Sequence, residues 1–221
     1  MKVSEAVAAR RSVRGFLDTP VDVERVRRLV IAASRAASGG NLQPWHIDIV
    51  AGDALARLKA TMLGKLARGE TEAPEYPIYP ADLPTPYRDY RFAVGEALYG
   101  AIGIPREEKA GRRMWFARNF AFFAHCAFFV TVDRRMGPPQ WQDLGQFLAT
   151  FMLLAVEDGL ATCAQECWAI YPETVKSVIG TPDERMLFCG MAIGFEDSND
   201  PANAMRSDRA SPDAWLNVLT D

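Results

Sequence analysis

Residues 142–157 place the strongest constraint on the fold, because their pattern is that of a helix with apolar residues on almost every side. Gly145 and Ala149 are small and share one side. Larger apolar side chains cover much of the rest: Phe147, Leu148, Phe151, Met152, Leu154 and Ala155. A helix that is apolar nearly all round cannot face water along its length. We therefore expect this helix to be buried in the core or across an interface between two subunits.

Other segments show helical or extended patterns. Asp22 is placed to cap a helix that Ser38-Gly39-Gly40-Asn41 ends, and Asp53 to cap a helix that runs to about Arg68. Further helices are predicted for residues 4–9, 91–103, 107–123 and 172–179. Strands are predicted for residues 46–50, 126–132, 186–195 and the first part of 161–168.

The order of these elements limits the fold class. Helices outnumber strands, and helical insertions of unequal length separate the strands, which favours an α+β fold or a three-layer α/β/α arrangement. The chain shows no internal repeat and no low-complexity tract. We expect a single domain over residues 1–221.

Residues 69–90 form an excursion rich in proline and tyrosine, with acidic residues among them. A connection of this length without periodicity is usually functional or mobile. Its aromatic residues could close over a flat ligand, or the segment could be a surface arm packed on a partner subunit. The sequence leaves both interpretations open.

Composition excludes several classes of protein. Apolar residues make up 49% of the chain, which is enough for a core. The net charge of −3 and the pI of about 5.5 argue against a nucleic-acid binder. The longest apolar run, residues 120–132, is too short to span a membrane. Residues 1–20 contain no apolar signal core, so we expect a cytoplasmic protein with reduced cysteines.

Three arginines and one hydroxyl lie close together near the start of the chain, at Arg10, Arg11, Ser12 and Arg14. Guanidinium groups bind phosphate through paired, permanently charged hydrogen bonds. In a chain of negative net charge, such a cluster indicates local recognition of an anion rather than a general basic surface.

These residues resemble the opening Arg-x-Ser-x-Arg/Lys-x-Phe motif of the FMN-dependent nitroreductase family. Ser38-Gly39-Gly40-Asn41-Leu42-Gln43-Pro44-Trp45 is similar to its second motif, Ser-x-x-Asn-x-Gln-Pro-Trp. Gly159-Leu160 with Gln165-Glu166-Cys167 falls where members place the segment facing the flavin. Gly190–Gly194, followed by Arg206 and Arg209, resembles the closing strand and basic tail. The similarity covers nearly the full length of the chain, and four motifs in the expected order make it specific.

The resemblance implies a mixed, mainly antiparallel sheet flanked by helices, and an intertwined, obligate homodimer with FMN at its interface. The implied cofactor-binding residues are Arg10, Arg11, Ser12, Arg14, Ser38, Gly39, Asn41, Gln43, Gln165, Glu166, Cys167, Arg206 and Arg209. Arg10, Ser12 and Arg14 would contact the phosphate, ribityl chain and pyrimidine edge. Arg209, alone or with Arg206, would reach the phosphate. Ser38, Gly39 and Asn41 would come from the partner subunit.

The segment facing the flavin has its own implied roles. Gln165 and Glu166 would lie against the isoalloxazine, and the backbone N–H of Cys167 would point at N5. Many family members have glycine at this position, so the thiol narrows the space beside the ring. Glu166 could be a catalytic acid or a structural acceptor. A positive group near N1–C2=O stabilises a reduced flavin, and Arg14 or Arg10 is the candidate.

The implied activity is hydride transfer from NAD(P)H through FMN to a nitroaromatic or quinone, with ping-pong kinetics and no indispensable acid–base side chain. We expect Tyr76–Tyr90, with Phe122 or Phe123, to wall the substrate pocket. Two alternatives remain: a reductive dehalogenase or flavin-degrading member of the family, and a flavin-binding redox sensor without turnover. We expect no metal site, because His46 and His125 suit packing positions and Cys163 and Cys167 lack metal-knuckle spacing. A redox disulfide between these two cysteines stays possible.

Overall fold

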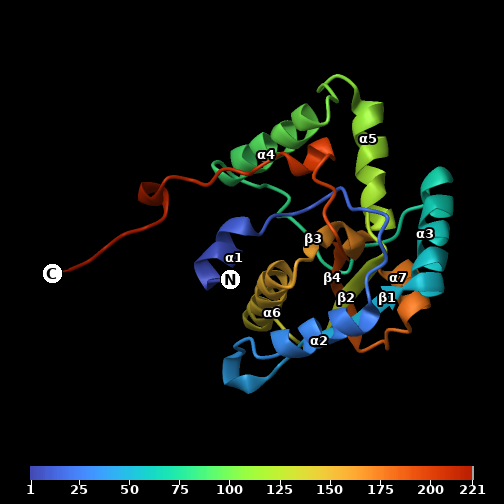
Figure 1. Cartoon of the computed structure of the whole chain (residues 1–221), viewed down its shortest axis with the longest axis horizontal. Helices are drawn as coiled ribbons and strands as arrows, with labels where there is room; N and C mark the ends of the chain where they lie inside the picture. Colours follow the sequence, from blue (N-terminus) through green and yellow to red (C-terminus); the bar gives the residue numbers. More distant parts are fainter. Residues whose placement is uncertain (221) are drawn as a thin grey trace.

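An antiparallel sheet of four strands forms the middle layer of the computed structural model, which describes residues 1–220 (Figure 1). The strands are β1 (His46–Ala51), β2 (Cys126–Asp133), β3 (Ala161–Gln165) and β4 (Arg185–Gly194). Their order in the sheet is β1-β2-β4-β3, and each neighbouring pair is antiparallel. An isolated parallel bridge joins Ser12 to Thr162 of β3. The N-terminal segment therefore lies along the sheet at β3.

Seven α-helices surround this sheet among the described residues. They are α1 (Val3–Ala9), α2 (Val23–Ala33), α3 (Gly52–Ala67), α4 (Tyr87–Ala101), α5 (Lys109–Ala117), α6 (Pro138–Glu157) and α7 (Pro172–Ile179). Short 3-10 turns follow or join them: η1 (Gly39–Asn41), η2 (Arg118–Ala121), η3 (Glu166–Ile170), η4 (Pro201–Asn203) and η5 (Pro212–Ala214).

The alternation of side chains along β2 builds the three layers. Phe128 and Val130 point to one face and pack with residues of α2 and α6, including Phe147. Ala127 and Phe129 point to the other face and pack with residues of α3 and α7. Successive side chains of a strand point to opposite faces, so β2, which is buried from Cys126 to Val132, supplies the centre of two cores. The three-layer α/β/α prediction is confirmed.

Helix α6 is buried on one side only within a single chain. Leu144, Phe147 and Phe151 are completely buried against α2 and the sheet. Gly145 and Ala149, on the opposite side, are exposed. The helix begins at Pro138, four residues before the predicted start, because proline suits a first turn and the Gln140 side chain accepts a 3.2 Å hydrogen bond from the Gly137 N–H.

Other predicted helix boundaries also differ from the structure, including that of the helix predicted for residues 91–103, which is α4 and begins at Tyr87. Asp22 does cap α2, since its carboxylate accepts a 3.0 Å hydrogen bond from the Glu24 N–H. The prediction for Asp53 is wrong: α3 begins at Gly52, and Asp53 lies inside the first turn without capping it. The helix predicted for 107–123 ends as an α-helix at Ala117. Phe122 and Phe123 then turn left-handed, at φ 56° and 58°, because Phe122 stacks 4.5 Å from the buried Trp168 ring.

The first half of the 69–90 excursion is attached to the body of the protein. The Glu72 carboxylate accepts hydrogen bonds from the N–H groups of Glu173 (2.8 Å) and Thr174 (3.2 Å) at the start of α7. Glu75 accepts from the Leu187 N–H in β4 at 2.9 Å. Tyr76 is half-buried between Trp141 and Phe188, and its hydroxyl donates to the Phe188 carbonyl. This part is a structural strap, and only the residues after it remain available for a ligand.

Replacing Glu72 with glutamine should lower the free energy of unfolding by about 1–2 kcal/mol at neutral pH, because the helix start and Lys65 lose a charged acceptor. The pKa of Glu72 lies below its ordinary 4.5: burial alone would raise it, but hydrogen bonds from Thr174 and Lys65 outweigh burial. A depressed carboxyl pKa gives stability that is present above the unfolded pKa and lost as the pH falls through the folded pKa. The difference between native and Glu72→Gln protein should therefore shrink below pH 4.5.

Urea unfolding at a series of pH values measures this difference. Glu70→Gln is the matched control, since Glu70 pairs with Arg68 and, at 3.7 Å, with Lys65 at an exposed position and should contribute little. A difference for Glu72→Gln that stays constant from neutral to acid pH would contradict a role for its charge.

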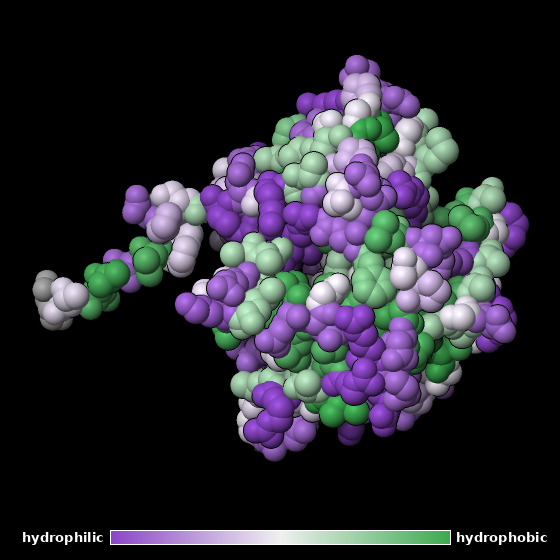
Figure 2. Space-filling model, viewed as in Figure 1, coloured by the Kyte–Doolittle hydropathy of each residue, from purple (hydrophilic) through white to green (hydrophobic). Residues whose placement is uncertain are grey.

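The last described residues leave the body as an extended tail (Figure 1). Apolar side chains on it are exposed, among them Trp215, Leu216, Val218 and Leu219. Figure 2 shows this apolar surface projecting away from the rest of the molecule. Over residues 1–220, no helix combines the length and apolar character that a membrane span requires.

Candidate functional site

A cavity of about 800 Å³ lies between α4, α5, the β3–η3 segment and the N-terminal segment. Its lining combines aromatic, charged and small residues. The lining residues that matter for its chemistry are Arg14, Tyr79, Arg88, Arg91, Phe92, Gly95, Glu96, Tyr99, Arg112, Phe116, Gln165, Glu166 and Cys167. A mostly apolar hollow with a few charged groups is the usual form of a small-molecule site.

The N-terminal segment reaches this cavity because it is hydrogen-bonded to the sheet. The Val13 N–H donates to the Thr162 carbonyl of β3 at 2.9 Å, and the Leu17 N–H donates to the Phe195 carbonyl at 2.8 Å. Val13 is buried, whereas Arg14 on the other side lines the cavity. The hydrogen bonds of this segment to the sheet therefore direct Arg14 toward the cavity.

Asn203, in η4, clamps the backbone of this segment. Its Oδ1 accepts hydrogen bonds from the N–H groups of Arg14 (2.8 Å) and Gly15 (3.2 Å). Its Nδ2 donates to the carbonyls of Gly15 (2.7 Å) and Asp197 (2.8 Å). Asn203 is buried, with 3% of its surface exposed, and its two hydrogen bonds with Gly15 are fully buried. Sequence reasoning missed this residue.

Gly15 is required at its position by close packing. A Cβ atom there would lie 2.2 Å from Cβ of Asp200, well inside van der Waals contact. Asp200 is itself held, because its carboxylate accepts a 2.9 Å hydrogen bond from the Ala202 N–H at the start of η4. Glycine thus lets the segment and η4 approach closely enough for Asn203 to bind both.

The three predicted N-terminal arginines have different surroundings. Arg11 forms an ion pair with Glu196, and its Nε is buried without a hydrogen-bond partner among residues 1–220. Arg14 donates only to the Ser12 carbonyl, at 3.2 Å. Across the described chain, neither Arg10 nor Arg14 has a carboxylate within ion-pair distance. Two guanidinium groups are therefore free to bind an anion.

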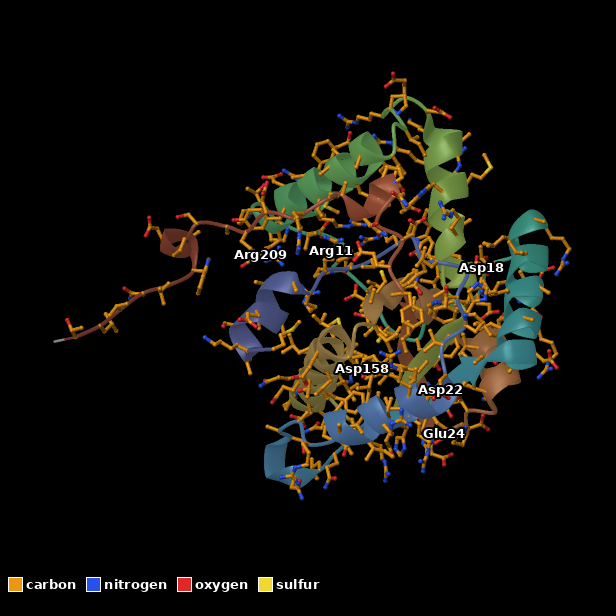
Figure 3. The ribbon with its side chains drawn as sticks, viewed as in Figure 1. Arg11, Asp18, Asp22, Glu24, Asp158 and Arg209 are labelled. Atoms are coloured by element: carbon orange, nitrogen blue, oxygen red, sulfur yellow. The ribbon has the colours of Figure 1, made fainter. Side chains whose placement is uncertain are left out.

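Figure 3 shows Arg11 and Arg209 on the same side of the molecule. Arg206 donates to the Ala8 carbonyl of α1 at 3.3 Å, so this part of the tail passes beside α1. Arg209 bonds only to its own neighbours, Ser207 and Asp208. Arg209 thus keeps its charge available, and Arg206 is partly used to position the tail.

Gln165, Glu166 and Cys167 all line the cavity, as expected of a segment that faces a ligand. The Gln165 side chain is committed to the fold: its Nε2 donates to Oδ1 of Asn119 at 3.0 Å, and its Oε1 accepts from the Trp168 ring N–H at 3.4 Å. Partial burial raises the pKa of Glu166. Burial likewise raises the pKa of the Cys167 thiol to about 12, so this thiol is protonated and unreactive at neutral pH.

Ser38, Gly39, Asn41 and Gln43 are grouped together, but they do not line this cavity. Ser38, Asn41 and Gln43 border a separate hollow of about 480 Å³ at the end of α2, and Gly39 follows Ser38 in the sequence. The Gly39 N–H donates to both carboxylate oxygens of the buried Asp143 in α6, at 3.1 and 3.2 Å. Asn41 and Gln43 are exposed and left-handed, at φ 57° and 49°. Strained, exposed backbone of this kind is concentrated at binding sites.

The predicted aromatic wall is only partly correct. Tyr79 lines the cavity, but Tyr76 packs in the core and Phe122 is completely buried. Phe123 packs against Trp115 and does not line the cavity. Phe116 lines the cavity wall where Phe122 or Phe123 was expected. The reason is the left-handed turn after η2, which directs Phe122 toward Trp168. The large contribution of α4 was not predicted.

The remaining titratable candidates serve other roles. His125 pairs with Asp18 at an exposed position. His46 lies on β1, and desolvation lowers its pKa. All four cysteines are free thiols.

Comparison with known proteins identifies the chain. The family model described as the nitroreductase family matches residues 7–195. The nitrobenzene nitroreductase of Ectopseudomonas oleovorans is 35% identical over 92% of this chain and 90% of its own length. The 4-nitrobenzoate reductase of Pseudomonas putida is 35% identical over 96% of this chain and 93% of its own length.

A solved structure agrees with these matches. The FMN- and NADPH-dependent nitroreductase NfnB from Sphigopyxis sp. strain HMH is 43% identical and superimposes with a TM-score of 0.96 over 100% of both chains. The FMN-dependent NfnB from Mycobacterium smegmatis, solved in complex with NADPH, is 26% identical, with a TM-score of 0.92 over 99% of this chain and 98% of that one. The chain therefore belongs to the nitroreductase family.

Proposed function

We propose that the protein is a flavin oxidoreductase that uses FMN to pass hydride from NAD(P)H to an electron-poor acceptor, chiefly a nitroaromatic. The observation that carries this proposal is Arg14. Its backbone is clamped by Asn203, its guanidinium has no carboxylate partner within residues 1–220, and it lines the same cavity as Glu166 and Cys167. A fixed, unpaired cation beside a large aromatic-lined hollow suits a flat, anionic cofactor.

The residues present fit FMN. The phosphate of FMN is a dianion, and Arg10, Arg14 and Arg209 are cations without ion-pair partners in the described chain. The buried Nε of Arg11 is a further donor without a partner among residues 1–220. The cavity is of the size that encloses a drug-sized ligand, about 300–1,000 Å³. Arg10, Ser12, Arg14 and Arg209 would hold the cofactor, with the Gln165–Cys167 backbone against its ring.

We further propose that two copies of the chain form each site. Ser38, Asn41 and Gln43 border a separate hollow in one chain, so in this proposal they and the adjacent Gly39 reach the cofactor from the partner subunit. Two surfaces support pairing: the exposed side of α6 at Gly145 and Ala149, and the apolar tail after η5. Exposed apolar surface of this kind marks interaction sites in soluble proteins.

Bound FMN supplies the electron chemistry by accepting hydride from NAD(P)H and passing it to the acceptor. The protein residues bind, orient and shield. Arg14 supplies positive charge in the cavity, which favours the arrival of electrons there. Phe92, Tyr99 and Phe116 offer flat apolar surfaces to an aromatic ring. One cavity serves reductant and acceptor in turn, so the kinetics should be ping-pong.

Nitroaromatics are the favoured acceptors because the relatives that match nearly the whole chain are named for reducing nitrobenzene, 4-nitrobenzoate and chloronitrobenzene. The similarity to a BluB-like flavoprotein is 18% in sequence and shows the fold alone. The free thiols support a place in the reducing cytoplasm.

An anaerobic steady-state assay tests this function. With NADPH as reductant and 4-nitrobenzoate as acceptor, we expect parallel double-reciprocal lines and turnover that depends on FMN. A quinone and a halophenol serve as alternative acceptors. Turnover of the halophenol with release of halide, but not of 4-nitrobenzoate, would replace nitroreduction with dehalogenation. No turnover of any acceptor would contradict an enzymatic role.

A further inference from the structure

One face of α4 forms much of the cavity wall. Its contributing residues recur three or four positions apart, as one face of a helix requires: Arg88, Arg91, Phe92, Gly95, Glu96, Leu98 and Tyr99. The face therefore presents two arginines and Phe92 in the first part of the helix, Gly95 after them, and Tyr99 one turn further along.

Gly95 is not required by the fold. It lies in the middle of α4, where glycine costs about 1 kcal/mol relative to alanine. Its backbone is ordinary helix, and an added Cβ would meet no atom of the chain within 4 Å. No packing contact within residues 1–220 thus explains the glycine. Because Gly95 lines the cavity, the open space next to it is available to a bound ligand.

Arg91 is the available cation on the same face. Its guanidinium lies 4.2 Å from the centroid of the Tyr79 ring, a contact that orients the group without neutralising it. Arg112 is already neutralised by the Glu96 carboxylate, with one contact at 3.1 Å. The Nε of Arg88 lies 3.6 Å from Oδ1 of Asp89, so Arg88 also has a carboxylate partner. Among the cavity-lining arginines of α4 and α5, Arg91 alone has no carboxylate partner within residues 1–220.

We infer that α4 selects the acceptor: the ring of a nitroaromatic lies against Gly95, and an anionic substituent on that ring, such as a carboxylate, binds Arg91. This inference rests on the proposed function. It assigns Gly95 and Arg91 as specificity-determining residues for negatively charged nitroarenes over neutral ones.

The 2′-phosphate of NADPH is the other anion that could bind Arg91. The carboxylate is favoured because Gly95 and Arg91 lie one helical turn apart on one face of α4. A benzoate-sized molecule can contact both at once. The phosphate of a dinucleotide is separated from its nicotinamide ring by the full length of the molecule.

Gly95→Ala and Gly100→Ala form a matched pair in the same helix. Gly100 also has no atom within 4 Å of an added Cβ, but it does not line the cavity. Both variants should unfold at slightly higher urea concentration than the native protein, because alanine favours helix. Only Gly95→Ala should weaken binding of benzoate, measured by titration calorimetry on the FMN-loaded protein. Equal benzoate affinity in the two variants would overturn the role of Gly95.

Arg91→Gln tests whether the positive charge of Arg91 binds the anionic substituent. Arg113→Gln is the control, because Arg113 is at an exposed position of α5 outside the cavity. For Arg91→Gln we expect benzoate affinity and kcat/KM for 4-nitrobenzoate to fall about tenfold, the value of one charged hydrogen bond. The kcat/KM for nitrobenzene and the ratio of NADPH to NADH use should not change. A selective loss of NADPH use, or equal losses for both nitroarenes, would overturn the inference.

These outcomes are separable from failure of the proposed function. If native protein bound no FMN, or if NADPH did not reduce it, the function itself would be wrong. If native protein were active but equally efficient with nitrobenzene and 4-nitrobenzoate, only the role of α4 would be wrong.

Discussion

Replacing Asn203 with alanine should leave a protein that is strongly destabilised and no longer retains FMN. The variant loses four hydrogen bonds at a position with 3% exposure and removes the acceptor from the buried Gly15 N–H and the part-buried Arg14 N–H. An unsatisfied buried polar group costs about 1–3 kcal/mol. Because the four bonds share one side chain, their losses are not additive. We expect the free energy of unfolding to fall by about 3–5 kcal/mol, the range of broken buried networks.

Urea unfolding of the apoprotein and fluorescence titration with FMN measure the two effects. Asn199→Ala is the matched control, because Asn199 is exposed on the same loop and only its backbone N–H is hydrogen-bonded. If the alanine variant does not fold, the same measurements are made on Asn203→Asp. Its carboxylate can still accept from Arg14 and Gly15 but cannot donate to the carbonyls of Gly15 and Asp197. Tight FMN binding by a folded Asn203→Ala protein would show that the clamp does not position Arg14.

Replacing Arg14 with alanine should weaken FMN binding by about 10- to 100-fold while leaving the fold unchanged. Hydrogen bonds to charged groups contribute about 1.5–3 kcal/mol, and 1.4 kcal/mol is a factor of ten in affinity. The fold should survive because the Arg14 side chain makes only one hydrogen bond within the described chain, at 3.2 Å to Ser12. The backbone contacts with Asn203 do not depend on the side chain.

The dissociation constant for FMN, from flavin fluorescence, measures this loss. Arg14→Lys separates charge from shape: lysine keeps the positive charge but lacks the planar fork, so its affinity should be intermediate. Arg27→Ala, which removes a well-exposed arginine of α2, should bind FMN as the native protein does. Unchanged affinity in Arg14→Ala would contradict the proposed cofactor position.

Local patterns predicted the layers of the fold because each depends on neighbours in sequence. The alternation along β2 and the cap at Asp22 are of this kind. The predictions of helix ends were wrong where contacts with distant residues determine the backbone conformation. Phe122 leaves its predicted helix to stack on Trp168, which lies 46 positions further along the chain. Asp53 is a good capping residue, but α3 begins one residue earlier without it.

Some residues of the candidate site could likewise be predicted from the sequence, and others could not. The arginine cluster and the Gln165–Cys167 segment could be predicted, because the family motifs preserve residue types at fixed spacing. Asn203 could not, because its partners Arg14 and Gly15 lie almost the whole chain away and an isolated asparagine carries no pattern. The cavity face of α4 was also missed. Its arginines and glycine are ordinary helix-surface residues until the fold places them opposite β3.

The absorption spectrum of the purified protein, before and after anaerobic addition of NADPH, tests the central claim most directly. That claim is that Arg14 and the other unpaired arginines hold FMN in a cavity open to a nicotinamide and an aromatic acceptor. We predict a yellow protein with stoichiometric FMN, which NADPH bleaches and 4-nitrobenzoate then recolours. A colourless protein that does not take up added FMN, or bound FMN that NADPH leaves oxidised, would contradict it.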